Sequence, residues 1–508
     1  MDKPRRPNGG RLPNERKRSV TPLFAAAAGI LAWLVLSAPV LAPGRQLGER
    51  DTARLYYPVE KTVAAALRAG RLPLWDSRIE CGTSILGQVT PAALHPFALL
   101  YLPLSFGFAF KLEHLLALLL GGCGAAILAL QLGASRWPAL FAGIAFGGSG
   151  ALVSAASGNL PYALGPGAAP LALGAVLWYL RAPSAGRLLA SSFALALCAY
   201  GGDPQSVGIA ILAALVLAVA ERPRPRRAVL VLSWAACGLL LCAPVALPAV
   251  SQLQRSDRRA GVIEGDRKLF FVPPVRLVGL AVPLAFDGSE SAPGEVWDPY
   301  SEFVARELTV PFLTSICLGA PALLFALALR RRAATPLLVL ATVLAAASTG
   351  AAWHVQPVLE AVIPGWGLFR YPEKLLLHVS WLVPVIAALG AQDALLGARS
   401  NARRIVWLGF ALAGVALGLF LLLFAAHGSV LQSSIAASHS RSPSIALRFL
   451  ESLRMGAARV AGLSAAVAAI GILRILRDRS EVPAALAAAA AAASCLIAPP
   501  LRTVRADL

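Results

Sequence analysis

The segment from residue 51 to residue 96 is polar, although apolar stretches flank it on both sides. Asp51 begins this segment, and its carboxylate could activate an acceptor hydroxyl as a general base or bind a divalent cation such as Mg²⁺ or Mn²⁺. An aspartate at this place also suits the N-terminal cap of a helix, and both roles can hold together. Polar loops of this length between hydrophobic helices are usually functional. We therefore predict that Asp51 is catalytic, with metal binding as a second role.

The same segment contains four further residues that could contact a substrate, namely Tyr57, Trp75, Asp76 and His95. They place aromatic, acidic and imidazole groups in the same loop as Asp51. A single histidine beside an apolar stretch is more often a structural residue, and that alternative stays open for His95. We predict that these four side chains belong to the substrate-binding surface.

The sequence GGDPQ at residues 201–205 comes between two apolar stretches. Two glycines, an aspartate and a proline could simply form a tight turn. However, an acidic residue at the rim of a membrane helix bundle is costly to bury and often marks a binding site. We predict that Asp203 and Gln205 bind substrate on the same face of the membrane as Asp51.

The sequence LFRYPEK at residues 368–374 precedes another apolar stretch, so Pro372 would begin a helix. The N-terminus of a helix attracts anions through its free N–H groups and its dipole. Arg370 and Lys374 add positive charge there, and arginine can bind a phosphate through two parallel hydrogen bonds. The alternative is that both cations only extend to the membrane interface. We predict that Arg370 and Lys374 bind a phosphate group.

A membrane-embedded helix bundle must position these groups, because the composition is that of a membrane protein. Among the 508 residues, 57% are hydrophobic and only 14% are charged, whereas soluble proteins have roughly 25% charged residues. Since backbone groups in lipid must be satisfied within each segment, we predict an all-α polytopic membrane protein. The net charge of +20 comes largely from arginine clusters between apolar stretches. Such clusters are typical of cytoplasmic loops and argue against nucleic-acid binding.

The hydrophobic pattern predicts about thirteen transmembrane helices. Their ranges are 19–43, 109–132, 137–156, 162–180, 188–201, 205–220, 228–250, 309–329, 333–349, 373–396, 405–426, 459–476 and 483–500. The predicted organisation is a basic cytoplasmic tail (1–18), a single transmembrane domain (19–500) and an outer C-terminal tail (501–508). The predicted outer loops are 44–108, 251–308, 350–372 and 427–458. Most acidic residues fall in the loops and turns predicted outside, among them Glu60, Glu80 and Glu373.

The first outer loop is predicted to contain an amphipathic helix that lies on the membrane surface. Its apolar positions recur at helical spacing, and its basic positions recur on another side; they are Tyr56, Val59, Val63 and Leu67, and Arg54, Lys61 and Arg68. Residues 91–106 are apolar but contain three prolines, which predicts a re-entrant or interfacial segment.

Three of these patches together resemble the YfhO-like family of bacterial membrane proteins. The first patch has the elements Tyr57-Pro58, GRLPLWD at residues 70–76 and His95-Pro96 after Asp51; the other two are GGDPQ and LFRYPEK. They occur in the order expected of that family. The chain departs from the family at Asp203, where relatives often have histidine.

The resemblance implies a GT-C-like fold and the GT-C class of polytopic glycosyltransferases. Such proteins transfer a sugar from a polyprenyl-phosphate carrier to an acceptor at the outer face of the bacterial cytoplasmic (inner) membrane. A carboxylate in the first outer loop is catalytic in this class, which maps to Asp51, and the phosphate-binding role maps to Arg370 with Lys374 as helper. The implied partners are membrane lipids and the lipid-linked sugar donor.

The alternative function is a transporter or flippase for a lipid-linked or anionic substrate. That function predicts ionisable residues near the middle of the membrane and repeated halves. In this sequence the ionisable residues gather at the predicted outer rim and no repeat is seen, so the pattern favours the enzyme.

Overall fold

The computed structural model describes residues 21–79, 81–220, 225–256, 270–283, 289–292, 295–297, 311–438, 442–477, 481–497 and 503–505. The predicted basic tail 1–18, Glu80, most of the outer loop 251–308 and residues 501, 502 and 506–508 of the C-terminal tail lie outside the described residues.

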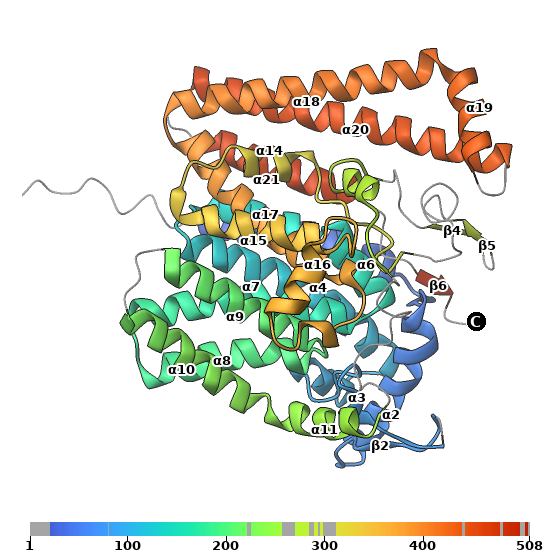
Figure 1. Ribbon diagram of the computed structural model, residues 1–508, viewed down its shortest axis with the longest axis vertical. Coiled ribbons are helices and arrows are strands. Elements are labelled where there is room, and N and C mark those ends of the chain that lie inside the picture. The colour runs from blue at the N-terminus through green and yellow to red at the C-terminus, as the bar shows by residue number, and fades with distance from the viewer. Residues whose placement is uncertain are drawn as a thin grey trace, which may run out of the picture.

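Most of the described chain is helical, and its helices form one bundle (Figure 1). α17 (Leu375–Ala391) lies inside this bundle, because every one of its residues is buried. A helix that is apolar on all sides is expected in the interior of a bundle. The helices in contact with it are α4 (Phe106–Gln131), α5 (Arg136–Gly147), α6 (Gly150–Gly158), α7 (Pro161–Arg181), α14 (Ala320–Leu327) and α15 (Thr335–Ala347).

Further helices extend the bundle on two sides of this centre (Figure 1). On one side lie α8 (Ala185–Tyr200), α9 (Pro204–Ala220), α10 (Pro225–Leu241) and α11 (Ala243–Gln254). On the other side lie α21 (Val482–Ile497) and the hairpin of α18 (Arg399–Ala425) and α20 (Pro443–Leu476), joined by α19 (His427–Ala437). α1 (Thr21–Leu41) packs against α5. The predicted outer loop 427–458 is thus mostly helical, and the predicted helix 459–476 is the second half of α20.

Within the described part of the chain, five helices are long and apolar enough to cross a membrane, or up to seven if each of two bent pairs counts as one span. The bent pairs are α5 with α6, at 42°, and α10 with α11, at 70°. The protein is therefore a multi-pass membrane protein. The shorter apolar helices include α8, α9 and α15, and the number thirteen stays a prediction.

The predicted helix 309–329 is wrong over its first half, because residues 311–319 are not helical and α14 begins only at Ala320. The reason is that side chains from other segments bind the backbone here. Phe312 and Leu313 donate their N–H groups to Glu373, and Thr314 donates its N–H to Ser154. These donors are therefore not available to a helix.

The first loop folds onto the N-terminal end of α4. It contains the π-helix η2 (Thr52–Tyr56), α2 (Tyr57–Arg68), the strands β2 (Trp75–Asp76) and β3 (Thr83–Ser84), α3 (Ile85–Gln88) and the 3₁₀-helix η3 (Pro96–Tyr101). α2 buries Val59 and Val63 and leaves Lys61 exposed, which is the amphipathic pattern expected of it; its position on a membrane surface stays a prediction. η3, with six residues, is too short to cross a bilayer.

The C-terminal strand β6 (Thr503–Arg505) pairs antiparallel with β1 (Arg45–Leu47), which follows α1. The C-terminal end of the described chain therefore lies beside the start of the first loop (Figure 1). A third pair is formed by β4 (Ser289–Ala292) and β5 (Glu295–Trp297).

The turn 201–205 packs tightly against both α7 and the first loop. A Cβ atom at Gly201 would lie 2.7 Å from the backbone nitrogen of Gly165 in α7. A Cβ atom at Gly202, which has φ +88°, would lie 3.1 Å from the carbonyl oxygens of Val89 and Thr90. The two glycines therefore let the turn that carries Asp203 approach both neighbours.

Candidate active site

Lys374 lies at the N-terminal end of α17, in the short 3₁₀-helix η8 (Pro372–Lys374). Its ammonium group donates a 2.8 Å hydrogen bond to the hydroxyl of Tyr162. Three ring centroids lie near the same nitrogen, at 4.0 Å for Tyr162, 5.0 Å for Tyr371 and 5.5 Å for Phe312. The face of an aromatic ring attracts a cation. This aromatic cage (Tyr162, Phe312 and Tyr371) therefore attracts and holds the Lys374 ammonium group.

Asp203 interacts electrostatically with Lys374 and also caps α9. Its carboxylate accepts hydrogen bonds from the backbone N–H groups of Gln205 and Ser206 and from the hydroxyl of Ser206. Burial raises the pKa of Asp203, and the attraction of Lys374 and these hydrogen bonds partly oppose that rise. Asp203 thus has both roles that the sequence left open: it stabilises the turn at the start of α9, and it interacts with the charge of Lys374.

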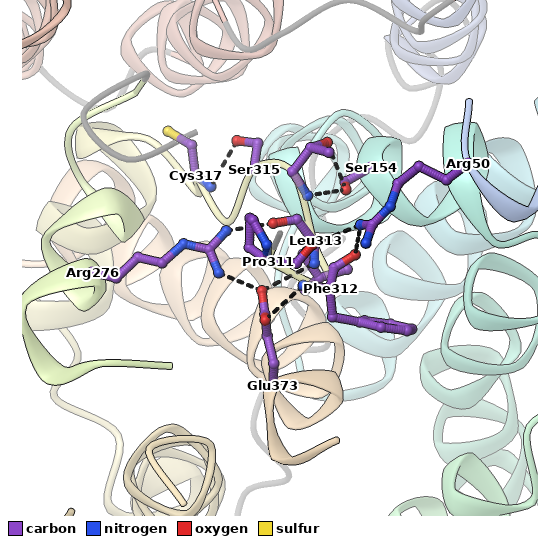
Figure 2. Close-up of polar contacts among 10 residues, drawn as sticks. Arg50, Ser154, Arg276, Pro311, Phe312, Leu313, Ser315, Cys317 and Glu373 are labelled. Carbon is purple, nitrogen blue, oxygen red and sulfur yellow. Dashed lines mark hydrogen bonds and ion pairs between the residues drawn. The ribbon is translucent and has the colours of Figure 1, made fainter. Parts of the chain in front are cut away.

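A buried ion pair between Arg276 and Glu373 positions one wall of the aromatic cage (Figure 2). Both side chains are fully buried. The Glu373 carboxylate accepts the N–H groups of Phe312 at 2.9 Å and Leu313 at 3.0 Å, and Arg276 also donates to the carbonyl of Leu313. These contacts hold the extended segment against the start of α17. The Glu373 carboxylate therefore faces the protein interior, and the prediction that Glu373 lies on the outer side of the membrane stays a prediction.

The first loop reaches the same place through Arg50, the residue before Asp51 (Figure 2). The Arg50 guanidinium donates hydrogen bonds to the carbonyl oxygens of Pro311 at 2.6 Å and Phe312 at 2.9 Å. Asp51 follows at the N-cap of η2, but its side chain makes no capping hydrogen bond and is exposed. The exposed Asp51 carboxylate thus follows a residue whose side chain is hydrogen-bonded to the segment that contributes Phe312 to the aromatic cage.

Tyr56 interacts electrostatically both with Asp51 and with Tyr162 of the aromatic cage. Burial raises the pKa of Tyr56 well above its usual value, and the nearby groups Tyr162, Asp51 and Glu60 raise it further. The phenol therefore stays neutral and can donate a hydrogen bond. Because Asp51 and Tyr162 both interact with this one hydroxyl, the predicted catalytic carboxylate and the cage that holds Lys374 lie at the same end of the bundle.

Three of the seven non-glycine residues with positive φ in the described chain lie around this cluster. Arg50, Phe270 and Tyr371 have φ values of +52°, +53° and +64°, although none is a glycine. The Phe270 ring packs edge to face on Tyr371 with centroids 4.7 Å apart, and its carbonyl accepts the N–H of Glu373. Strained residues persist only where the surroundings hold them, and they are frequent at active sites.

Arg370 is the second predicted phosphate ligand, and it lies beside Tyr371 of the aromatic cage. Its guanidinium carbon is 5.0 Å from the centroid of the Tyr371 ring, and the side chain is half-buried. Arg370 and Lys374 therefore both contact Tyr371, which brings two positive charges to one ring.

The two candidates of strand β2, Trp75 and Asp76, have structural contacts. Asp76 is buried and accepts hydrogen bonds from Thr62 at 3.0 Å and from Arg78, with which it forms an ion pair. These partners lower the pKa of Asp76, even though burial alone would raise it. Trp75 is 59% exposed, and its indole covers Gly82, where a Cβ atom would lie 2.7 Å from the ring.

His95, Tyr57 and Gln205 also have clear structural roles. His95 is buried and caps η3 by accepting the N–H of Phe97, and burial lowers its pKa to about 3, so it is neutral. Tyr57 packs edge to face on Phe106 and Phe110 at the N-terminal end of α4. Gln205 is buried in the first turn of α9. Substrate binding by these residues stays a prediction.

Two buried glutamates lie where α2 of the first loop packs against α4. Glu60 of α2 and Glu113 of α4 are each 1% exposed, and Glu113 accepts a 2.7 Å hydrogen bond from Tyr101. Burial raises the pKa of Glu60 well above its usual value, and the neighbouring Glu113 raises it further. Two carboxyl groups this close cannot easily both ionise, so Glu60 is held in its protonated form.

No group of three or more His, Cys, Asp or Glu side chains that could hold a metal ion occurs within the described residues. Metal binding at Asp51 stays a prediction.

The sequence does not reveal the aromatic cage or the Arg276–Glu373 pair. Tyr162, Phe312 and Tyr371 come from three distant segments, and nothing in their local sequence links them. One signal was present for the ion pair: Arg276 is a single charge in the apolar run VPPVRLVGLAVP. A lone ionisable residue in such a run usually has a buried partner.

The fold and the site define a multi-pass helical membrane protein in which the first loop, the turn 201–205 and the start of α17 meet at one end of the bundle. Neither a protein-family model nor a curated protein matches the chain. Among solved structures, ArnT from Cupriavidus metallidurans bound to undecaprenyl phosphate is similar, with a TM-score of 0.52, 14% identity, and coverage of 95% of this chain and 77% of ArnT. This similarity shows that the two proteins share a fold.

Two larger membrane enzymes are also similar over part of their length. Arabinofuranosyltransferase AftD from mycobacteria has a TM-score of 0.44 at 15% identity, over 73% of this chain and 25% of AftD. Arabinosyltransferase EmbB from Mycobacterium smegmatis has a TM-score of 0.38 at 16% identity, over 97% of this chain and 41% of EmbB. The chain thus spans a quarter of AftD and less than half of EmbB.

Proposed function

We propose that this protein is a glycosyltransferase that moves a sugar from a polyprenyl-phosphate carrier to an acceptor hydroxyl. The observation that carries the proposal is the Arg50 contact with Pro311 and Phe312, which ties the residue before the exposed Asp51 to the segment that contributes Phe312 to the cage around Lys374. A base and a fixed cation at one end of a membrane bundle suit a reaction in which a hydroxyl is deprotonated and a phosphate leaves. The fold shared with ArnT, which was solved with undecaprenyl phosphate, supports this class of donor.

The proposed roles follow from the charges. Asp51 takes the proton of the acceptor hydroxyl, whose oxygen forms a bond to the anomeric carbon as the bond from that carbon to the phosphate oxygen breaks. Lys374 and Arg370 stabilise the negative charge that develops on the departing lipid phosphate. The aromatic cage and Asp203 hold Lys374 at the start of α17. Tyr56, neutral because of its burial, is a hydrogen-bond donor that interacts with both Asp51 and Tyr162.

The proposed location is the outer face of the bacterial inner membrane, with the N-terminus in the cytoplasm. The placement of arginine clusters in the sequence supports this orientation. Membership of the YfhO-like family belongs to the same proposal and rests on the three sequence patches.

The test is sugar transfer by purified Asp51→Asn protein with polyprenyl-phosphate sugars as donors. Loss of a general base typically lowers the rate by about 10²- to 10⁴-fold, and we expect a loss in that range. Glu451→Gln is the matched control, because Glu451 is an exposed acid on α20, far along the chain from the site. If the Asp51→Asn protein transfers sugar at the rate of the Glu451→Gln protein, Asp51 is not the base.

A further inference from the structure

α11 follows a helix that is almost long enough to cross the membrane. α10 has 17 residues, so at 1.5 Å per residue it is about 25 Å long, against a hydrocarbon core of about 30 Å. The chain then bends by 70° into α11, which turns this helix toward the plane of the membrane. α11 packs mainly against α3 and lies beside α2 and β2 (Figure 1). It is therefore placed at the membrane interface on the side of the first loop.

The exposed side of α11 changes from apolar to polar along the helix. Leu247 and Val250 are exposed large apolar side chains. Ser251, Gln254 and Arg255 follow them and are exposed as well. An apolar face that gives way to polar and basic residues is typical of a helix that lies in a membrane interface. The composition of α11 thus agrees with the place that the length of α10 gives it.

α3 joins α11 to the sequence GRLPLWD (residues 70–76) of the first loop. A Cβ atom at Gly87 in α3 would lie 3.1 Å from the Cβ atom of Gln252, near the polar end of α11. Ile85, at the start of α3, donates its N–H to the carbonyl of Leu74 at 3.0 Å. The GRLPLWD segment therefore lies at the same membrane interface as the end of α11.

The GRLPLWD segment exposes its large apolar side chains. Leu72 is 65% exposed, Leu74 is 54% exposed and Trp75 is 59% exposed. Arg71 and Arg78 flank these residues and are exposed too. In membrane proteins, tryptophan is enriched at the level of the lipid headgroups, and arginine extends from an apolar surface toward the polar region. The exposed side chains of this segment are thus of the types that such an interface favours.

α2, the helix of the first loop that the sequence predicts to lie on the membrane surface, has its apolar face inside the protein. Val63 of α2 forms a buried cluster with Ile85 of α3 and with Ala93, and Leu67 packs against the same cluster. Lys61 is on the exposed side of α2. α2 therefore cannot offer its apolar face to lipid, whereas the GRLPLWD segment can.

We propose that Leu72, Leu74 and Trp75 insert into the lipid interface of the membrane, beside the exposed face of α11. Their apolar surface leaves water for the acyl chains, while Arg71 and Arg255 extend toward the lipid phosphates. This contact fixes the first loop, and with it the predicted catalytic carboxylate, at the membrane surface. It is independent of the proposed sugar transfer, because it uses no side chain to which that reaction assigns a role.

The test is tryptophan fluorescence of the full chain in nanodiscs of phosphatidylcholine brominated either near the headgroup or near the end of the acyl chain. Bromine quenches an indole that it contacts. The difference between the unaltered protein and Trp75→Phe gives the signal of Trp75. We expect the lipid brominated near the headgroup to lower this signal at least about twofold, and the other lipid to lower it less. The same signal in brominated and ordinary lipid, or stronger quenching near the chain end, overturns the proposal.

Two further tryptophans give the scale of this measurement. Trp407 is 75% exposed on α18, which is long and apolar enough to cross a membrane, so the signal lost in Trp407→Phe should be one that brominated lipid quenches. Trp381 is buried in α17, and its signal should not be quenched. If Trp75→Phe does not fold, oxidation of Trp75 by hydroxyl radicals in the unaltered protein decides instead. We expect it to be at least about fivefold slower in nanodiscs than in the urea-unfolded chain, and equal rates overturn the proposal.

The variant for the lipid contact is Leu72→Ser with Leu74→Ser, and its matched control is Leu417→Ser with Leu421→Ser in α18. Both variants replace two exposed leucines, but only the first pair belongs to GRLPLWD. We expect the first variant to lose at least half of the quenching of Trp75 and the control to keep it. Equal quenching in the two variants also overturns the proposal, because the leucines then do not insert. If the first variant does not fold, the quenching of Trp75 in otherwise unaltered protein decides the question.

Discussion

The ammonium of Lys374 and the hydroxyl of Tyr162 form a 2.8 Å hydrogen bond across 212 positions of the chain. This bond ties the start of α17 to the start of α7. The same ammonium lies 4.0 Å from the centroid of the Tyr162 ring. Tyr162 therefore accepts a hydrogen bond from Lys374 and also contacts it through its aromatic ring. The predicted phosphate-binding lysine is thus held in one orientation before any ligand arrives.

We expect Lys374→Met to abolish most of the donor binding, because it removes the charge and keeps the length of the side chain. A hydrogen bond to a charged group contributes about 1.5–3 kcal/mol, so kcat/KM for a polyprenyl-phosphate sugar should fall at least tenfold. The measurement is sugar transfer together with the thermal shift produced by polyprenyl phosphate. Unchanged transfer and an unchanged thermal shift would remove Lys374 from the site.

We expect Tyr162→Phe to have a smaller effect, because the ring near Lys374 is kept and only the hydrogen bond is lost. Transfer should fall to a value between those of the unaltered protein and Lys374→Met. Tyr179→Phe is the matched control, since Tyr179 lies near the other end of the same helix and contacts Ser233. A loss of transfer as large in Tyr179→Phe as in Tyr162→Phe would mean that the effect comes from general damage to α7.

We expect Glu373→Gln to destabilise the fold strongly, because it leaves the buried Arg276 without its counter-charge. Breaking a buried ion pair by removing one partner costs about 3–5 kcal/mol. Replacement of both residues by methionine should cost less, because no charge is then left buried. The measurement is the Tm of each variant in the same detergent. A double variant less stable than Glu373→Gln would contradict this account of the pair.

We expect the stability of the protein to fall as the pH rises above the ordinary pKa of glutamate, in part because of Glu60. Its pKa in the folded protein is raised by burial and by Glu113. The folded state therefore binds the proton more tightly than the unfolded state. Its contribution is fully present below the unfolded pKa of 4.5 and is lost as the pH rises through the folded pKa, with a slope of at most about 1.4 kcal/mol per pH unit.

The Glu60 prediction is checked by Tm measurements across pH with Glu60→Gln, which cannot ionise. This variant should show a flatter decline of Tm with rising pH than the unaltered protein. Glu451→Gln is the control because Glu451 is exposed. The same pH profile in Glu60→Gln and in the unaltered protein would show that Glu60 does not carry the effect.

The sequence by itself determined the membrane class, most helix positions and the segments that carry the candidate site. These properties depend on local composition and periodicity, which a chain displays without folding. The apolar runs predicted α4, α7 and α17 to within a few residues, and the polar segments marked Asp51, Asp203 and Lys374.

Only the tertiary structure decided which of these residues meet and which have purely structural contacts. The loss of helix at 311–319, the aromatic cage and the burial of Glu60 and Glu373 all depend on contacts between segments far apart in the chain. The free energy of such a contact depends on the partner and on the exclusion of water, and neither is encoded in the local pattern around a residue. Asp76 and Asp203 illustrate this, because both lie in predicted loops. Asp76 is hydrogen-bonded to Thr62 and paired with Arg78, whereas Asp203 interacts with Lys374.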